Sequence, residues 1–215
     1  MRKLLAFVPV IAASCAALAL AASPASAQAS TGPHTVGRIV RPVHRDGMPV
    51  AGYAVDREHI AHFGCNPGPS PVAVQDNIRF CGPSVADTVA CWKSRHHTVL
   101  CLRDPQKKVL ARIRYVGTFR PVRALNRPSP QALTLFSGAY CLIRDGGAFP
   151  PVSGHPHWFG DYTCSNGAFL YGRGRDGIVR SPEPWQVHMV WFHENGTQTI
   201  RTRQIRRAYY VGTAR

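Results

Sequence analysis

Six cysteines between residues 65 and 164 constrain the fold of this chain more than any other feature of its sequence. Cys81, Cys91 and Cys101 stand ten residues apart, and short apolar runs separate them. Such runs, broken by turn-forming or charged clusters, are typical of antiparallel strands. An even number of cysteines in an exported chain also predicts disulfides, each stabilising a domain by about 2–4 kcal/mol. The stretch 81–102 is therefore predicted to be a strand meander cross-linked by sulfur.

The pairing of the cysteines stays open at this point, because six cysteines allow fifteen connectivities. Cys81–Cys91 competes with the pairs that we favour. None of the six has the CxxC-like spacing of a zinc site, so neither a metal site nor a cofactor is expected. The favoured pairs are Cys91–Cys101, which closes a hairpin, Cys141–Cys164, which joins two strands across a long loop, and the remaining Cys65–Cys81.

The N-terminus has the pattern of a secretory signal peptide. Arg2 and Lys3 precede a largely apolar run over 4–20, and the Ala-Ser-Ala ending at Ala27 fits the small-x-small cleavage rule. Residues 1–27 are therefore predicted to be a signal peptide, which places the protein outside the cell or in its envelope.

A lipoprotein signal is the alternative reading of the same segment. Residues 12–15 form a degenerate lipoprotein box, which would attach lipid to Cys15, although the usual leucine of that box is missing. No other apolar run approaches the roughly 18 residues of a membrane span, so no transmembrane segment is expected.

The chain is strongly basic, with 26 Lys and Arg, 11 Asp and Glu, and a formal net charge of +15. Without the signal peptide, 24 basic residues and the same 11 acids leave +13. A folded basic protein outside the cell is attracted to polyanions and anionic surfaces. We therefore expect a monomeric, non-enzymatic binding or structural module for anionic cell-envelope polymers or lipids. No recognised nucleic-acid module is present, so no nucleic acid is expected as a partner.

Two strands carry the candidate binding residues. Arg112 and Arg114 share one face of a strand predicted over 109–115, and Arg201 and Arg203 share one face of the last hairpin. If the two faces adjoin, they form a cationic stripe that could hold a phosphate- or carboxylate-bearing polymer. The alternative is a solvated basic face that only keeps the protein soluble.

The spacing of apolar runs and turn residues predicts a mainly β fold, with antiparallel strand meanders in two similar-sized, disulfide-stabilised halves. Little helix is expected after the signal peptide. Residues 28–48 are polar and aperiodic and are predicted to be a flexible tether. Residues 49–215 are predicted to form a single domain, whose halves, 49–118 and 131–215, are joined by a linker over 119–130 that is rich in Arg and Pro.

Asn195-Gly196 makes the last hairpin the sharpest local prediction. The dipeptide favours a two-residue type I′ turn, which would pair Trp191 with Ile200. One face of this hairpin is expected to be buried, and it carries Trp185, Val187, Met189, Trp191 and Ile200.

No motif in the chain predicts catalysis. There is no GxSxG, and the acids lie mostly in turns, where Asx-turn formation explains them. The alternative function is a cell-envelope hydrolase that uses Asp145 and Asp161 as paired carboxylates, or the loop carrying His155 and His157. We favour no enzymatic activity and name no catalytic residue.

Several segments resemble a group of secreted actinobacterial proteins of unknown function. They are CGPSVADTVACW, TVLCLRDP, YCLIRDGG, DYTC, RSPEPWQV and AYYVGTA, which together span most of 65–214. The resemblance implies a secreted or envelope location and a three-disulfide scaffold. It carries no known activity, so no functional residue is transferred. This chain departs from the group in having Gln106, where a tryptophan is expected, and in being more basic.

Overall fold

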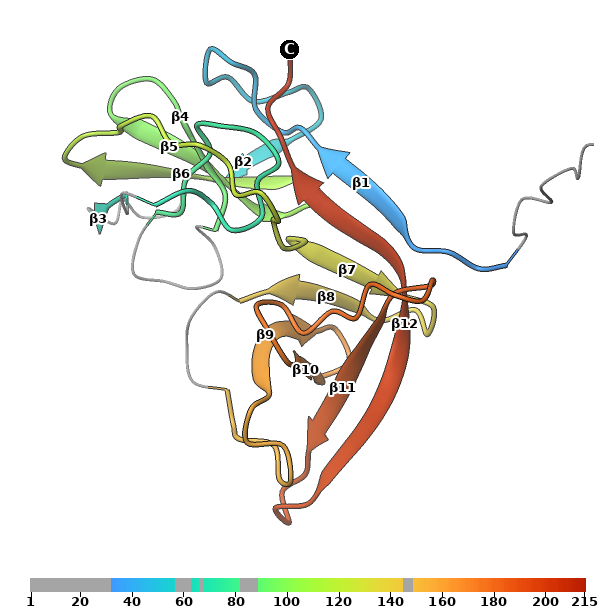
Figure 1. The fold of residues 1–215 in the computed structure, drawn as a ribbon. Helices are drawn as coiled ribbons and strands as arrows, with labels where there is room; N and C mark the ends of the chain where they lie inside the picture. The colour runs from blue at the N-terminus through green and yellow to red at the C-terminus, as the bar shows by residue number, and fades with distance from the viewer. Residues whose placement is uncertain (1–31, 57–62, 66–67, 82–88, 145–148) are drawn as a thin grey trace, which may run out of the picture. The chain divides into compact units, whose positions relative to one another are not determined.

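Every regular element that the described residues form in this computed structural model is a β-strand (Figure 1). The structure describes residues 32–56, 63–65, 68–81, 89–144 and 149–215. Within these ranges no helix long and apolar enough to cross a membrane is found. The predicted mainly β, antiparallel, disulfide-stabilised fold is confirmed.

Six strands close into an antiparallel barrel. Each strand is hydrogen-bonded to the next along the chain, and β12 returns to pair with β7. β1 (Val36–Val40) lies outside the ring and pairs in parallel with the C-terminal part of β12. The strands of the ring are β7 (Ala132–Leu135), β8 (Tyr140–Ile143), β9 (Phe159–Cys164), β10 (Phe169–Gly172), β11 (Gln186–Phe192) and β12 (Gln198–Val211).

The other five strands form a second sheet in the order β2-β6-β5-β4, with β3 also paired to β6. Both sheets belong to one compact unit over residues 33–215. The strands are β2 (Ala54–Asp56), β3 (Phe63–Gly64), β4 (Cys91–Lys93), β5 (Thr98–Asp104) and β6 (Val109–Val116).

One hydrophobic core joins the two sheets. Leu102 and Leu110 of the second sheet are fully buried in the same cluster as Leu133, Leu170 and Ile205 of the barrel. Each fully buried leucine or isoleucine contributes about 1.5–3 kcal/mol. The opposite face of β6 packs on the disulfides of the second sheet. The two halves of the chain thus share one core while keeping separate sheets.

All three favoured disulfides are confirmed, and the competing Cys81–Cys91 pair is not formed. The sulfur–sulfur distances are 2.11 Å for Cys65–Cys81, 2.00 Å for Cys91–Cys101 and 2.09 Å for Cys141–Cys164. The last two bonds join residues that lie directly opposite each other on paired strands, β4–β5 and β8–β9.

The segment predicted as a tether over 28–48 contains β1. Thr35 lies where β1 and β11 meet along one edge of β12, and its side chain is buried. Its Oγ1 donates to the carbonyl of Ile205 at 2.7 Å and accepts from the backbone N–H of Trp185 at 2.8 Å. The ordered structure therefore begins earlier in the chain than the tether prediction places it.

The linker predicted over 119–130 is fixed to the loop before β4. Buried Arg79 donates from Nε to the carbonyl of Arg120 at 2.6 Å, and its guanidinium lies 5.1 Å from the Phe119 ring centre. Asp76 accepts from the N–H of Ala124 at 2.8 Å. These contacts hold an irregular, proline-rich segment in one position.

The turn and register predicted for the last hairpin are wrong. β11 and β12 pair Val190, not Trp191, with Ile200. The N–H of Gly196 donates to the carbonyl of His193 at 2.9 Å, and only Gly196 of the Asn195-Gly196 pair has positive φ, at 77°. This is a three-residue loop ending in a glycine bulge. The one-residue shift leaves Ile200, which was expected to be buried, 37% exposed.

Replacing Thr35 with valine tests the junction of β1, β11 and β12. Thr35→Val keeps the shape of the side chain but leaves one buried carbonyl and one N–H without a partner. We expect the free energy of unfolding to fall by about 1–3 kcal/mol, measured by urea denaturation. Thr118→Val, at an exposed threonine with no hydrogen bond to a described residue, is the control. An equal effect of the two substitutions would contradict the role given to Thr35.

Candidate functional site

The structure has two cavities of interest, and Val74 lines both of them. Cavity 1 has a volume of about 1260 Å³ and cavity 2 a volume of about 1150 Å³. Cavity 1 is lined by Arg41, His44, Arg45, Val74, Gln75, Asp76, Asn77, Trp92, Lys93, Phe119, Pro121, Thr213 and Arg215. Both volumes are somewhat larger than those of ordinary ligand sites, roughly 300–1,000 Å³.

Cavity 1 is cationic. Four exposed cations line it, and they come from three separate parts of the chain: Arg41 and Arg45 after β1, Lys93 in β4, and Arg215 after β12. Their side chains make no ion pair or hydrogen bond with any described residue. Asp76 is the one carboxylate side chain in the lining, and it accepts a hydrogen bond from the linker. With four cations against the one carboxylate of Asp76, the lining of cavity 1 carries excess positive charge.

Hydrogen bonds from both sheets hold the wall of cavity 1. Trp92 of β4 donates from Nε1 to Oγ1 of Thr213, which follows β12, at 3.0 Å. The N–H of Thr213 in turn donates to Oε1 of Gln75 at 2.5 Å. His44 Nδ1 lies 3.1 Å from the backbone oxygen of Arg215. The cations thus stand on a wall whose position both sheets determine.

Cavity 2 has an apolar floor and a rim of arginines. Gly37 and Ile39 of β1 and Tyr210 of β12 form one side, and register places Ile39 directly opposite Tyr210. The other lining residues belong to the linker and to the segment between β10 and β11: Leu125, Asn126, Arg127, Pro128, Arg173, Gly174, Arg175, Asp176, Ile178 and Arg180.

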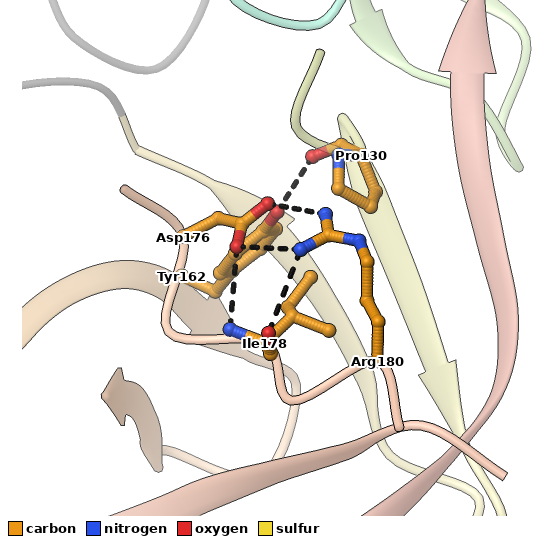
Figure 2. A network of polar contacts seen from close by, with 5 residues as sticks. All are labelled: Pro130, Tyr162, Asp176, Ile178 and Arg180. Carbon is orange, nitrogen blue, oxygen red and sulfur yellow. Dashed lines mark hydrogen bonds and ion pairs between the residues drawn. The ribbon is translucent and has the colours of Figure 1, made fainter. Parts of the chain in front are cut away.

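An ion pair fixes the β10–β11 segment beside cavity 2 (Figure 2). Asp176 accepts from Arg180 at 2.6 Å and 3.1 Å, one bond to each carboxylate oxygen, and its Oδ1 also accepts from the N–H of Ile178 at 3.3 Å. Burial alone lowers the pKa of Arg180, but the hydrogen bonds and charge of Asp176 outweigh it and raise that pKa above its usual value. Arg180 also lies over the Trp185 ring, at 5.2 Å.

A close backbone contact shapes the same segment. Gly177 has φ of 64°, and a Cβ placed on Gly172 would lie 2.4 Å from the carbonyl oxygen of Gly177. Only glycine at both positions allows the end of β10 and the following loop to approach so closely. As a result, the intervening Arg173 and Arg175 are exposed at the rim.

The four arginines chosen from the sequence lie on two different sheets. Arg112 and Arg114 are on β6, and Arg201 and Arg203 are on the half of β12 that pairs with β11. In Figure 1, β6 lies well apart from the half of β12 that pairs with β11. The structure does not bring the two pairs together into one stripe, and neither pair lines either cavity.

The candidate hydrolase residues are placed only in part. Asp145 lies outside the described residues. His155 stacks on Trp158 with 3.8 Å between ring centres, and Trp158 stacks on His188 at 4.3 Å. Burial, and then the charge of His155, lower the pKa of His188. Among the described residues no group of three His, Cys, Asp or Glu could hold a metal ion. The hydrolase hypothesis stays a prediction.

The residues that line the cavities were largely missed by reasoning from the sequence. Arg173 and Arg175 lie in the run YGRGRDG, whose alternating Gly and Arg indicates a basic turn. That local signal was available. Arg41 and Arg215 meet only through the pairing of β1 with β12, so no local pattern predicts their proximity.

Comparison with known proteins found no relative of this chain. No protein-family model matches the chain, and neither a curated protein nor a solved structure matches it.

Substituting Asp176 with asparagine tests the ion pair beside cavity 2. Asp176→Asn removes the charge opposite Arg180, whose side chain is 39% exposed while that of Asp176 is 10% exposed. Because Arg180 keeps some contact with water, we expect a loss of about 1–2 kcal/mol in the free energy of unfolding. Glu194→Gln, in the exposed β11–β12 turn, is the matched control. Equal stability of the two variants in urea denaturation would contradict a stabilising pair.

The loop before β9 offers a test by pH. Tyr171 donates to the carbonyl of Pro150 at 2.7 Å, and burial raises the pKa of Tyr171 to about 12 from 10.0. The folded state therefore favours the neutral phenol. The contribution of the neutral Tyr171 phenol to the free energy of unfolding is complete below pH 10.0. This contribution is lost as the pH rises through about 12. We expect the stability advantage of the wild type over Tyr171→Phe to shrink across this interval. A constant difference in denaturation midpoint between the two proteins would contradict it.

Proposed function

We propose that the protein is a secreted or cell-envelope-associated binding module, without catalytic activity, that holds an anionic polymer of the envelope in cavity 1. The observation that carries the proposal is the convergence of Arg41, Arg45, Lys93 and Arg215 on one cavity, with no ion pair to a described residue. Charges that are merely solubilising have no reason to converge on one concave site.

The chemistry of cavity 1 suits a ligand with repeated negative charges. Guanidinium and ammonium groups make charge-assisted hydrogen bonds to phosphate and carboxylate oxygens. Four cations from three separate segments can contact successive charges of one chain, whereas a single small anion would contact fewer of them. Trp92 and Phe119 add aromatic surface at the wall of the same cavity.

The location outside the cell is supported by the sulfur chemistry. Three disulfides among the described residues fit an oxidising compartment. The predicted signal peptide over 1–27 agrees with that location. Polyanions of the cell envelope are the anionic polymers that such a protein would meet.

A polyanion titration with two charge-neutralised variants tests this function. The cavity variant is Arg41→Gln/Arg45→Gln/Lys93→Gln. The control is Arg114→Gln/Arg201→Gln/Arg206→Gln, which removes the same charge from exposed positions outside both cavities. The probes are labelled polyphosphate and a polyglycerol phosphate, with dextran as the neutral polymer, followed by fluorescence anisotropy.

We expect the wild type to bind both polyanions and not dextran, and to lose at least about tenfold in affinity between roughly 50 mM and 300 mM salt. The cavity variant should lose at least about tenfold at low salt, while the control loses less than about threefold. Equal losses in the two variants would mean that net charge alone drives binding. Binding that is independent of salt would also overturn the proposal.

A further inference from the structure

We propose that cavity 2 is a second binding site, separate from cavity 1, for an amphiphilic anion that carries one anionic headgroup and one alkyl chain. The floor of the cavity supplies the first argument. Ile39 is 43% exposed there, although it is a large apolar residue on a strand. Ile178 and Leu125 line the cavity on either side. Together with Tyr210, which packs partly against the main core, these side chains give the cavity an apolar lining.

Gly37 leaves room for a ligand on that floor. A Cβ added at Gly37 would meet no heavy atom within 4 Å, so the space above β1 is open at this position. A glycine in a strand interior weakens the strand and often marks a place that another molecule approaches. Here the open space continues the surface of Ile39, two residues further along the same face of β1.

The rim supplies the headgroup contacts. Arg127 belongs to the linker, and Arg173 and Arg175 belong to the β10–β11 segment, so cations from two separate segments line the same cavity. All three are exposed, and none makes an ion pair or hydrogen bond with a described residue. The cations are therefore available to a phosphate or carboxylate.

The one carboxylate in the lining does not cancel this charge. Asp176 is 8% exposed and is held by Arg180 through two hydrogen bonds, at 2.6 Å and 3.1 Å. The Asp176–Arg180 pair is neutral as a unit, which leaves three uncompensated arginines above the apolar floor. Figure 2 shows the carboxylate turned toward the guanidinium.

These two surfaces together select one class of ligand. A hydrophilic polyanion would leave the apolar floor in contact with water, and a neutral apolar molecule would leave the arginines without partners. An alkyl chain gains free energy with each CH₂ that it buries on the apolar floor, and an anionic headgroup gains charge-assisted hydrogen bonds from the rim. Cavity 1, whose wall is mostly polar and cationic, offers no comparable floor.

Binding of decyl phosphate to the full chain, below its micelle concentration, tests the proposal by calorimetry. Inorganic phosphate and decyl maltoside separate the contributions of headgroup and chain, and decanoate distinguishes a fatty-acid source from a lipid-phosphate source. We expect decyl phosphate or decanoate to bind at least about tenfold more tightly than either inorganic phosphate or decyl maltoside.

Two variants assign the binding to cavity 2. Gly37→Val fills the floor without changing charge, and Gly64→Val, on β3 outside both cavities and equally open at the Cβ, is its control. We expect Gly37→Val to weaken decyl phosphate binding by at least about tenfold and Gly64→Val to leave it unchanged. Arg173→Gln/Arg175→Gln should weaken it to a similar extent, and this variant decides the matter if Gly37→Val does not fold.

Polyphosphate binding in cavity 1 should be the same in wild type and Gly37→Val, so the two proposals fail separately. If decyl phosphate binds no more tightly than decyl maltoside, the arginines of the rim do not bind the headgroup, and that part of the proposal is wrong. If decyl phosphate binds no more tightly than inorganic phosphate, the apolar floor does not bind the alkyl chain, and that part of the proposal is wrong. Retention of full decyl phosphate affinity in folded Gly37→Val and in the arginine variant would overturn the site itself.

Discussion

Pairing of β12 along both of its edges is the constraint on which the rest of this structure depends. The strand has 14 residues and pairs with β11, β7 and β1. A register shift between Ile205 and Arg207 divides it into a half that pairs with β11 and a half that pairs with β7 and β1. Such bulges increase the local twist of a strand, which helps a sheet to close. Tyr210 in cavity 2 and Thr213 and Arg215 in cavity 1 all follow from the path of this one strand.

The two cavities share a boundary at Val74 but differ in the chemistry of their walls. In cavity 1 the polar side chains are engaged with one another, as in the chain of contacts from Trp92 through Thr213 to Gln75, and the cations are left exposed. In cavity 2 the acid and one arginine neutralise each other, and apolar side chains remain uncovered. An excess of basic residues spread through the sequence is thus divided by the fold between two cavities with different linings.

Local chemistry explains which features were predictable from the sequence. The ten-residue spacing of Cys91 and Cys101 predicted a bond across a hairpin, and alternation along 109–115 predicted β6. β1 was missed because Gly37 and Arg38 weaken its pattern and its partner, β12, is far away in sequence. The register of the last hairpin was wrong because a three-residue loop takes the place of the predicted two-residue turn, and loop residues bury the outer face of β11 at Val190, while Val187 and Met189 pack in the main core. With both faces buried, one-sided burial did not determine the register.

The pairing of β1 with β12 joins the first described strand to the last. Val36 lies beside Arg207, so a contact of very long sequence separation completes this edge of the sheet. A ribosome or a secretion channel delivers such a chain from its N-terminus, and the barrel cannot close until β12 has emerged. Both cavities use residues from this last part of the chain, so neither lining is complete until β12 has folded. High contact order slows folding, so a barrel closed by strands this far apart in sequence is expected to form late.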